Sequence, residues 1–181
     1  MPKFAVISPT HIEGKKKEAW ENFRDGGYIA IGSVVCQDLS GKSIDEIRRI
    51  VEFEETKAEN NNPEYKRPKD MVGAYEQFFS LAIGDYVAVN NVSDGLFGIG
   101  EIISPYRFKE HAHNTGSTDP KDFYCHFRDV KWLVTSYMKR SDILKVTNER
   151  WWDPYGIITV YPKIPEYIKR IIRDIETGRK K

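Results

Sequence analysis

The sequence predicts an α+β domain with a curved, mixed or antiparallel sheet that closes partly into a barrel and has helices around it. Alternating apolar runs, typical of half-buried strands, dominate the middle of the chain. Amphipathic helical patterns stand between and after these runs. The length of 181 residues and the hydrophobic content of 40% suit one domain that buries a sizeable core.

The first third of the chain predicts strands that alternate with helices. Trp20 and Phe23 share one helical face, which favours the core for both, and the glycines at 26–27 end that pattern, as glycine does after a helix. Ser43 precedes the next helical pattern and Glu46 follows three residues on, which predicts an N-cap with a capping box. The expected elements are a strand at 4–8, a helix at 16–23, a strand at 28–32 and a helix at 44–51.

The remainder of the chain predicts a connector, a hairpin, a loop and a terminal helix. Residues 54–70 are polar and carry three asparagines before a proline, which predicts an exposed connector. Residues 109–121 are rich in His, Gly, Asp and Pro and predict a long loop. The other expected elements are a helix at 71–81, a hairpin at 84–102, a long strand or strand pair at 123–134, a strand at 157–160 and a helix at 164–175.

The hairpin contains residues that a plain sheet does not need. Gly98 and Gly100 interrupt its second strand, where glycine weakens pairing unless the strand bends or a partner comes close. Asn90 and Asn91 end its first strand, and they are either turn formers or polar groups at the rim of a pocket that could bind adenine. The hairpin is therefore either scaffold or one wall of a binding site.

Composition excludes several classes of protein. The formal net charge of +1 does not by itself indicate a polyanion partner. No apolar run reaches the roughly 18 residues of a membrane span, and the start of the chain leads directly into a strand pattern, so neither a span nor a signal peptide is expected. Cys36 and Cys125 are too few for a disulfide framework, which favours a cytoplasmic setting. Cys36 is interpreted as a small core residue, with a reactive thiol as the alternative.

Motifs for catalysis and cofactor binding are absent from the sequence. There is no GxxxxGK[ST] phosphate loop, no GxSxG elbow and no HExxH pair. His111, His113, Cys125 and His126 form no spacing typical of a structural zinc site. We therefore expect no cofactor, no metal and no catalytic residue in this chain.

Five short stretches occur in an order that carries a resemblance: GGYIAIGS, DLSGKSIDEIRRIV, FFSLAIGDYVAVNN, LFGIGEIISPYRF and HFRDVKWLV. Together they resemble the EVE domain, a PUA-like fold related to the YTH domains that read N6-methyladenine. The resemblance runs from Phe4 to about Val134, and the whole is most similar to the N-terminal DNA-recognition domain of archaeal McrB-type subunits from modification-dependent restriction systems.

The resemblance implies a reader without chemistry of its own. Residues 1–175 would form the nucleic-acid-reading domain, and residues 176–181 would be a basic tail or a linker to a further domain. Its ligand would be double-stranded DNA that carries a modified base, flipped from the duplex into an aromatic-lined pocket. Its other partners would be a GTPase domain that oligomerises and a separate nuclease subunit, with no membrane involved.

The resemblance also places a base pocket, at three positions. These are the loop after the first strand, the end of the second strand, and the loop and strand that follow the glycine-rich strand. Ser33 stands where many family members carry a tryptophan, so another aromatic residue has to supply that wall of the pocket. The candidate base-pocket residues are Thr10, His11, Ser33, Val34, Asn90, Asn91, Tyr106, Phe108, Phe123, Tyr124, Trp132 and Trp152.

Basic residues near these positions are candidates for phosphate contacts, because a few cations in one place suffice even on a protein of low net charge. A solvated charged surface is the alternative for each of them. The candidates are Lys15, Lys16, Lys66, Arg67, Lys69, Arg107 and Lys109. The residues leave two other functions open: an RNA-binding module of the same fold, and a small hydrolase that acts on modified nucleosides.

Overall fold

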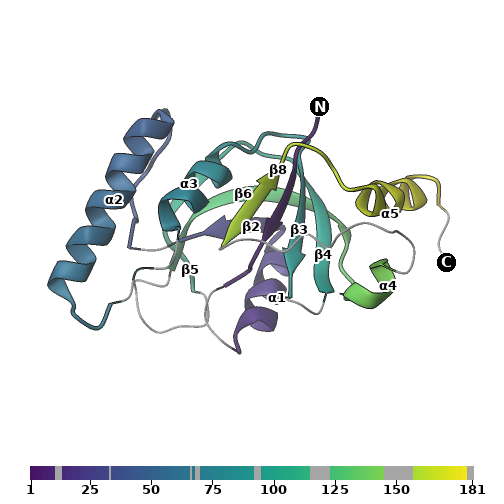
Figure 1. Ribbon diagram of the computed structural model, residues 1–181, viewed down its shortest axis with the longest axis horizontal. Helices are drawn as coiled ribbons and strands as arrows, with labels where there is room; N and C mark the ends of the chain where they lie inside the picture. Colours follow the sequence, from purple (N-terminus) through teal and green to yellow (C-terminus); the bar gives the residue numbers. More distant parts are fainter. Residues whose placement is uncertain are drawn as a thin grey trace.

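Eight strands form one curved mixed sheet within the part of the chain that the structure describes (Figure 1). In this computed structural model the described residues are 1–10, 14–32, 34–65, 67, 70–91, 95–114, 123–144 and 157–178, without the side chains of 111–114, 123 and 144. The strands are β1 (Phe4–Ile7), β2 (Tyr28–Ile31), β3 (Tyr86–Asn90), β4 (Gly95–Ile102), β5 (Arg107–Asn114), β6 (Phe123–Val134), β7 (Met138–Lys139) and β8 (Ile158–Tyr161). The helices are α1 (Lys16–Gly26), α2 (Ile44–Asn61), α3 (Met71–Phe79), α4 (Arg140–Leu144) and α5 (Glu166–Glu176).

The sheet curves because one long strand serves two sets of neighbours. The main path runs β2-β6-β4-β3-β1-β8, with β5 added to β6 and β7 added to β4. The first part of β6 pairs with β2 and β5, and its last part pairs with β4. A register shift between Ile99 and Gly100 marks the pairing of β4 with β6. Such an irregularity bends a strand, which agrees with the predicted curved and partly closed sheet.

The two faces of the sheet bury separate cores. On β1, Ala5 and Ile7 join the larger core with α1, α2 and α3, while Phe4 and Val6 join a smaller core with α5. This division follows from the alternation of side chains along a strand. Figure 1 shows α5 apart from α1 and α3. The predicted α+β architecture with helices around the sheet is therefore confirmed.

The ends of the first two helices follow the predicted local signals. Gly27, in the left-handed conformation at φ 65°, closes α1 and donates its backbone N–H to Arg24 and Phe23. Ser43 and Glu46 form the capping box at the start of α2. Both signals depend on residues that are close in sequence, which explains why they could be identified without the tertiary structure.

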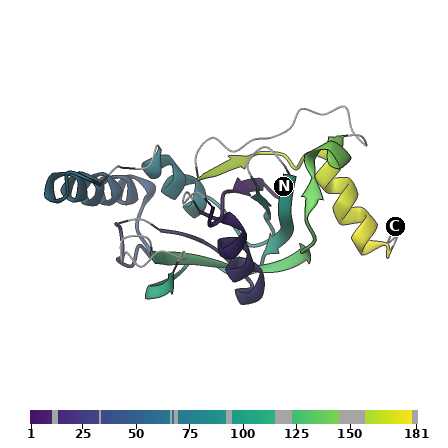
Figure 2. The same ribbon diagram turned by 90° about the horizontal axis from the view of Figure 1, so that it is seen from below.

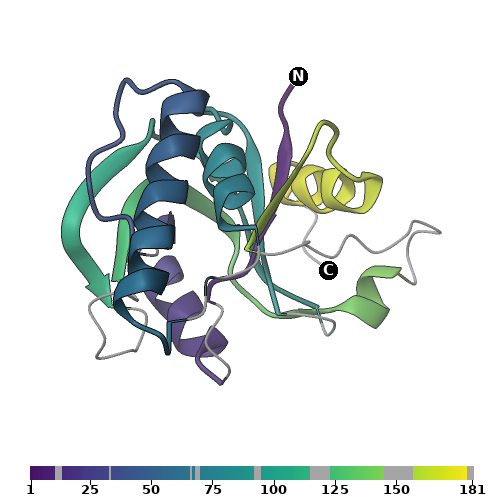
Figure 3. The same cartoon turned by 60° about the vertical axis from the view of Figure 1, so that its left-hand side comes forward.

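Two predicted loops are wrong in part. Helix α2 continues to Asn61, so the first part of the expected connector at 54–70 is helical. Its Glu, Lys and Ala residues are good helix formers, and Lys57 pairs with Glu54 one turn away. Figure 2 shows α2 extending away from the sheet, and Figure 3 shows α3 beside it. Strand β5 reaches Asn114, inside the expected loop at 109–121, because it pairs with β6.

Among the described residues, no helix combines the length and the apolar character that a membrane span requires.

Candidate base-binding cavity

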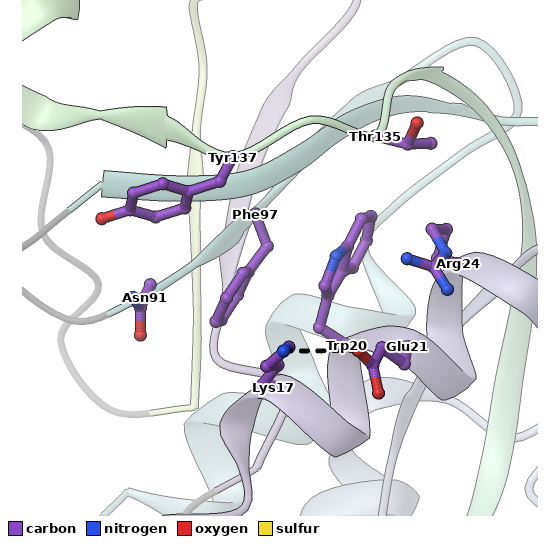
Figure 4. A pocket seen from close by; sticks show the side chains of 8 residues that line it. All are labelled: Lys17, Trp20, Glu21, Arg24, Asn91, Phe97, Thr135 and Tyr137. Atoms are coloured by element: carbon purple, nitrogen blue, oxygen red, sulfur yellow. Dashed lines mark ion pairs between the residues drawn. The ribbon is translucent and has the colours of Figure 1, made fainter.

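A cavity of about 400 Å³ opens between α1, β4 and the chain that joins β6 to β7. This volume lies in the range of roughly 300–1,000 Å³ that is usual for ligand sites in proteins. Figure 4 shows its lining side chains, with Phe97 between Trp20 on one side and Asn91 and Tyr137 on the other. The lining residues are Lys17, Trp20, Glu21, Arg24, Asn91, Phe97, Thr135 and Tyr137.

Three aromatic rings form the apolar wall of the cavity. The rings of Trp20 and Phe97 are nearly parallel, at 10°, with their centroids 6.1 Å apart. The Tyr137 ring lies 6.0 Å from that of Phe97 at an angle of 55°. Trp20 is only 4% exposed, whereas Tyr137 is 44% exposed. Trp20 is therefore a buried, fixed part of the wall, whereas the Tyr137 ring lies at the surface, where it can stack on a flat ligand.

Trp20 is held in place from behind. Its ring meets that of Trp132 edge-on, with centroids 4.8 Å apart, and the Trp132 indole N–H donates to the Phe23 carbonyl at 3.0 Å. The missing side chain of Gly98 provides the space in front, because a Cβ there would lie 2.3 Å from the Trp20 ring. A Cβ at Gly100 would lie 2.3 Å from Val130 Cγ1 and 2.8 Å from the Trp132 ring. Gly98 and Gly100 of β4 thus accommodate aromatic rings of the chain itself.

The polar side of the cavity comes from one face of α1. Lys17, Glu21 and Arg24 are four and three residues apart, so they line the same side of the helix. The Lys17 ammonium lies 4.0 Å from the Glu21 carboxylate, and the Arg24 guanidinium donates to Asp25 at 2.7 Å. That hydrogen bond raises the pKa of Arg24 and lowers the pKa of Asp25. The cavity thus combines apolar walls with two cations and one carboxylate.

Asn91 is the predicted pocket residue that lines this cavity. It follows β3, and its backbone N–H donates to the Gly95 carbonyl at 3.0 Å, across the base of the hairpin. Its half-buried amide can both donate and accept a hydrogen bond. Asn90 is buried, and its side-chain oxygen has no hydrogen-bond partner among the described residues. Trp132 contributes indirectly, by supporting Trp20.

Two of the other described pocket candidates, Tyr106 and Phe108, lie around a buried histidine. His126 is fully buried on β6, and its Nε2 lies 2.9 Å from the Val35 carbonyl. Because a carbonyl can only accept, Nε2 carries the proton, and Nδ1 then accepts from the Tyr106 hydroxyl at 2.9 Å. The Tyr106 oxygen also accepts from the Leu39 N–H at 3.2 Å. The ring of Phe108 lies 5.8 Å from that of His126.

Burial determines the protonation of this polar network. It lowers the pKa of His126 to about 4 and raises the pKa of Tyr106 to about 12. Both groups are therefore neutral at neutral pH, which is the state that their hydrogen bonds require. The candidates Tyr106 and Phe108 thus pack around a filled polar core rather than line the cavity of Figure 4.

The remaining described pocket candidates are tied to the core. Tyr124 is buried and donates its hydroxyl proton to the Pro9 carbonyl. Thr10, which follows Pro9, is buried, and Val34 is half-buried against the larger core. His11, Ser33 and Trp152, together with the side chain of Phe123, lie outside the described residues, so their part in a pocket stays a prediction.

The phosphate-contact candidates lie on separate elements. Lys15 pairs with Glu18 at 2.9 Å just before α1, and burial lowers the pKa of Lys16 in the first turn of that helix. Both precede Lys17 of the cavity. On β5, Arg107 pairs with Asp129, and Lys109 is exposed. Arg67 is half-buried beyond α2. Lys66 and Lys69 lie outside the described residues.

The two cysteines are joined in a disulfide, which the sequence reasoning did not foresee. Cys36 and Cys125 have Cα atoms 5.7 Å apart and are separated by 89 positions. The bond ties the segment after β2 to β6, next to Val35 and His126 of the polar network. The interpretation of Cys36 as an isolated core residue or a free thiol is therefore wrong. The pairing depends on the fold, since β2 and β6 become neighbours only in the sheet.

Sequence reasoning missed most of the cavity. Trp20 was assigned to the core, where it lies, but its ring also forms the cavity wall. Neither Phe97 nor Tyr137 is among the predicted pocket residues. The sequence did contain a signal near Phe97, because this residue directly precedes Gly98. A glycine inside a strand often marks a place where another group comes close. No comparable signal marks Tyr137, which reaches the cavity through the pairing of β7 with β4.

The fold and the cavity define the class: an α+β domain with a partly closed sheet and an aromatic cavity between its first helix and a hairpin. The chain belongs to the family described as Domain of unknown function (DUF8426), which matches residues 7–153. No curated protein matches the chain. Among solved structures, the chain is similar to the YTH domain of the Zygosaccharomyces rouxii MRB1 protein in complex with N6-methyladenosine RNA. That similarity has 16% identity, covers 97% of this chain and 87% of the other, and has a TM-score of 0.37.

Proposed function

We propose that this chain is a reader of modified nucleic acid that holds one extruded base in the cavity between α1 and β4. The observation that carries the proposal is the wall of Trp20, Phe97 and Tyr137 around a space of about 400 Å³. A nucleobase is flat, apolar on its faces and polar at its edges. The cavity has the matching combination of aromatic rings and edge-reading groups.

The energetics of a reader require several contributions together. Flipping a base from a duplex costs a few kcal/mol in unstacking and unpairing. Stacking on an aromatic side chain returns about 1–3 kcal/mol. A methyl group that enters an apolar slot adds about 1 kcal/mol. Lys17 and Arg24 at the cavity can meet a phosphate, and such contacts make binding fall as the salt concentration rises.

The specific ligand in this proposal is N6-methyladenine in double-stranded DNA. Asn91 can pair with the edge of adenine, and the aromatic wall can accept the methyl group. The chain would then be the targeting module of a McrBC-like restriction system in the cytoplasm, without a chemical step of its own. A GTPase domain and a nuclease subunit would supply the chemistry. RNA with the same base is the alternative ligand, because the cavity groups read the base rather than the sugar.

Fluorescence anisotropy with short labelled oligonucleotides tests the proposal. We expect the wild-type chain to bind a duplex with one N6-methyladenine about tenfold more tightly than the unmodified duplex, because the methyl contact is worth about 1 kcal/mol or somewhat more. The matched RNA, run in parallel, decides between the two nucleic acids. Affinity for the preferred ligand should fall steeply with rising salt. Equal affinity for modified and unmodified strands would count against a reader.

Substitution of Tyr137 tests the place of the base. Tyr137→Ala should weaken binding of the modified oligonucleotide about tenfold, since the loss of one stacking partner costs about 1–3 kcal/mol. Phe53→Ala is the matched control, because Phe53 is also an exposed aromatic residue, at 65%, but lies on α2. If both variants bind like the wild type, the base does not occupy this cavity.

A further inference from the structure

The cavity contains one side chain that can only accept hydrogen bonds. Of the eight lining residues, Lys17 and Arg24 can only donate, and so can the Trp20 indole. Asn91, Thr135 and Tyr137 can both donate and accept. Glu21, when ionised, has two acceptor oxygens and no donor.

The acceptor capacity of Glu21 is not used up by its neighbour on the helix. The Lys17 ammonium lies 4.0 Å away, which is an ion-pair distance but longer than a hydrogen bond (Figure 4). The other cation on this face, Arg24, donates at 2.7 Å to Asp25 instead. The Glu21 side chain is 44% exposed, so water can reach it while the cavity is empty.

A ligand that fills the cavity displaces this water. If the ligand presents an N–H group to the carboxylate, the lost hydrogen bonds to water are replaced. If it presents only acceptors, the carboxylate loses hydration without compensation, and an unpaired charged group costs more than an unpaired neutral one. The Glu21 carboxylate therefore penalises ligands without a donor at that edge.

We propose that Glu21 makes the cavity selective for bases that keep at least one exocyclic N–H. This inference rests on the proposed function of the same cavity. A singly methylated amino group retains one N–H, which donates to Glu21, while its methyl group lies toward the aromatic wall. A base with two methyl groups on that nitrogen, or with oxygen in its place, has no such donor and is rejected. The ligand class is thus a monoalkylated or unmodified amino base.

A pair of nearly isosteric bases tests this selectivity. One duplex carries a single N6-methyladenine, and the other carries 6-methoxypurine, in which oxygen replaces the exocyclic N–H. We expect the wild-type chain to bind the first about tenfold more tightly, a moderate ratio because Glu21 is partly exposed. In Glu21→Gln the ratio should fall close to one, because an amide can accept from N–H or donate to oxygen.

Glu18→Gln provides the matched control. Glu18 is one turn earlier on α1, is also exposed and pairs with Lys15, but it does not line the cavity. It should leave the preference for N6-methyladenine unchanged. The melting temperatures of both variants should stay near that of the wild type, which excludes unfolding as the cause of an effect.

The outcomes separate this inference from the proposed function. Equal wild-type affinity for the two bases, or a preference that survives in Glu21→Gln, overturns the role of Glu21. If binding still depends on Tyr137 in that case, the cavity remains the base site and only the selectivity is wrong. If no oligonucleotide binds, or if binding is indifferent to Tyr137, the proposed function fails and this inference fails with it.

Discussion

Two aromatic regions of the molecule differ in what their polar groups contact. Around His126, the hydroxyl of Tyr106 and both imidazole nitrogens are satisfied by the protein itself. Around the cavity, Glu21 and Asn91 face a space of about 400 Å³ beside aromatic rings. A region whose hydrogen bonds are closed internally stabilises the fold, whereas a region with polar groups directed into a cavity can bind a ligand.

The comparison shows why aromatic residues alone are a poor guide to a pocket. Tyr106 and Phe108 were predicted from their place in the chain, yet they pack around a buried side chain. Trp20 lies in the core as predicted, and its ring also lines the cavity. The hydrogen bonds that complete the first cluster come from Val35 and Leu39, which are far from β6 in the sequence. Substitutions in the two regions should therefore have opposite consequences for stability and for binding.

The largest stability effect is expected from the disulfide beside the polar network. Replacing both Cys36 and Cys125 by alanine should lower the free energy of unfolding by about 4.5 kcal/mol, because the bond closes a long loop in the unfolded chain. The separation of 89 positions is the basis of this value. Denaturant titration of the double variant beside the wild type measures it, and binding at the cavity, which neither cysteine lines, should persist. A loss below about 1 kcal/mol would contradict the loop-closure argument.

Protonation of His126 gives the next effect. Its folded pKa of about 4 lies below the ordinary value of 6.5, so between these two values the unfolded chain binds more protons than the folded one. This contribution to stability is therefore complete above pH 6.5 and is lost as the pH falls toward 4, by up to about 3 kcal/mol.

Denaturant titrations at several pH values between 7.5 and 4 measure this loss. His126→Gln should remove the part of the pH dependence of the free energy of unfolding that is due to His126, because a glutamine has no titrating group. The glutamine amide can still donate an N–H to the Val35 carbonyl. The hydrogen bond from Ser40 holds the pKa of Asp38, which lies near His126, below its ordinary value, so this carboxylate does not titrate in the folded protein over this range and is the same in both proteins. An identical pH dependence for the two proteins would show that His126 is not held neutral by burial.

The smallest expected change in stability comes from removing a single tyrosine hydroxyl, and the same substitution can be made in both regions. Tyr106→Phe removes the hydroxyl that forms hydrogen bonds with Leu39 and His126. It should lower the free energy of unfolding by about 1–3 kcal/mol, because buried partners lose a hydrogen bond. Tyr137→Phe removes a hydroxyl from a ring that is 44% exposed, and should change stability by less than about 0.5 kcal/mol. Urea denaturation at neutral pH measures both. Equal losses would remove the distinction between the two regions.

Local sequence patterns predicted most of the elements, because their causes are local. The period of the apolar residues identified α1, α3 and α5, and the Ser43–Glu46 box marked the start of α2. The patterns failed where pairing with a distant segment decided the outcome. Strand β5 exists through its pairing with β6, and β7 through its pairing with β4. Neither strand has an apolar alternation that could have marked it in the sequence.

The sequence by itself determined the α+β class and the chain order of the main elements, and it marked the glycines at positions 98 and 100 as places where the strand bends or a partner comes close. Only the tertiary structure decided that the neighbours of those glycines are Trp20 and Trp132, that Cys36 meets Cys125, and which aromatic rings border a cavity. The physical reason is one of range. Helix periodicity and caps act within a few residues, whereas a cavity wall combines side chains from α1, β4 and the approach to β7, which only the folded sheet brings together.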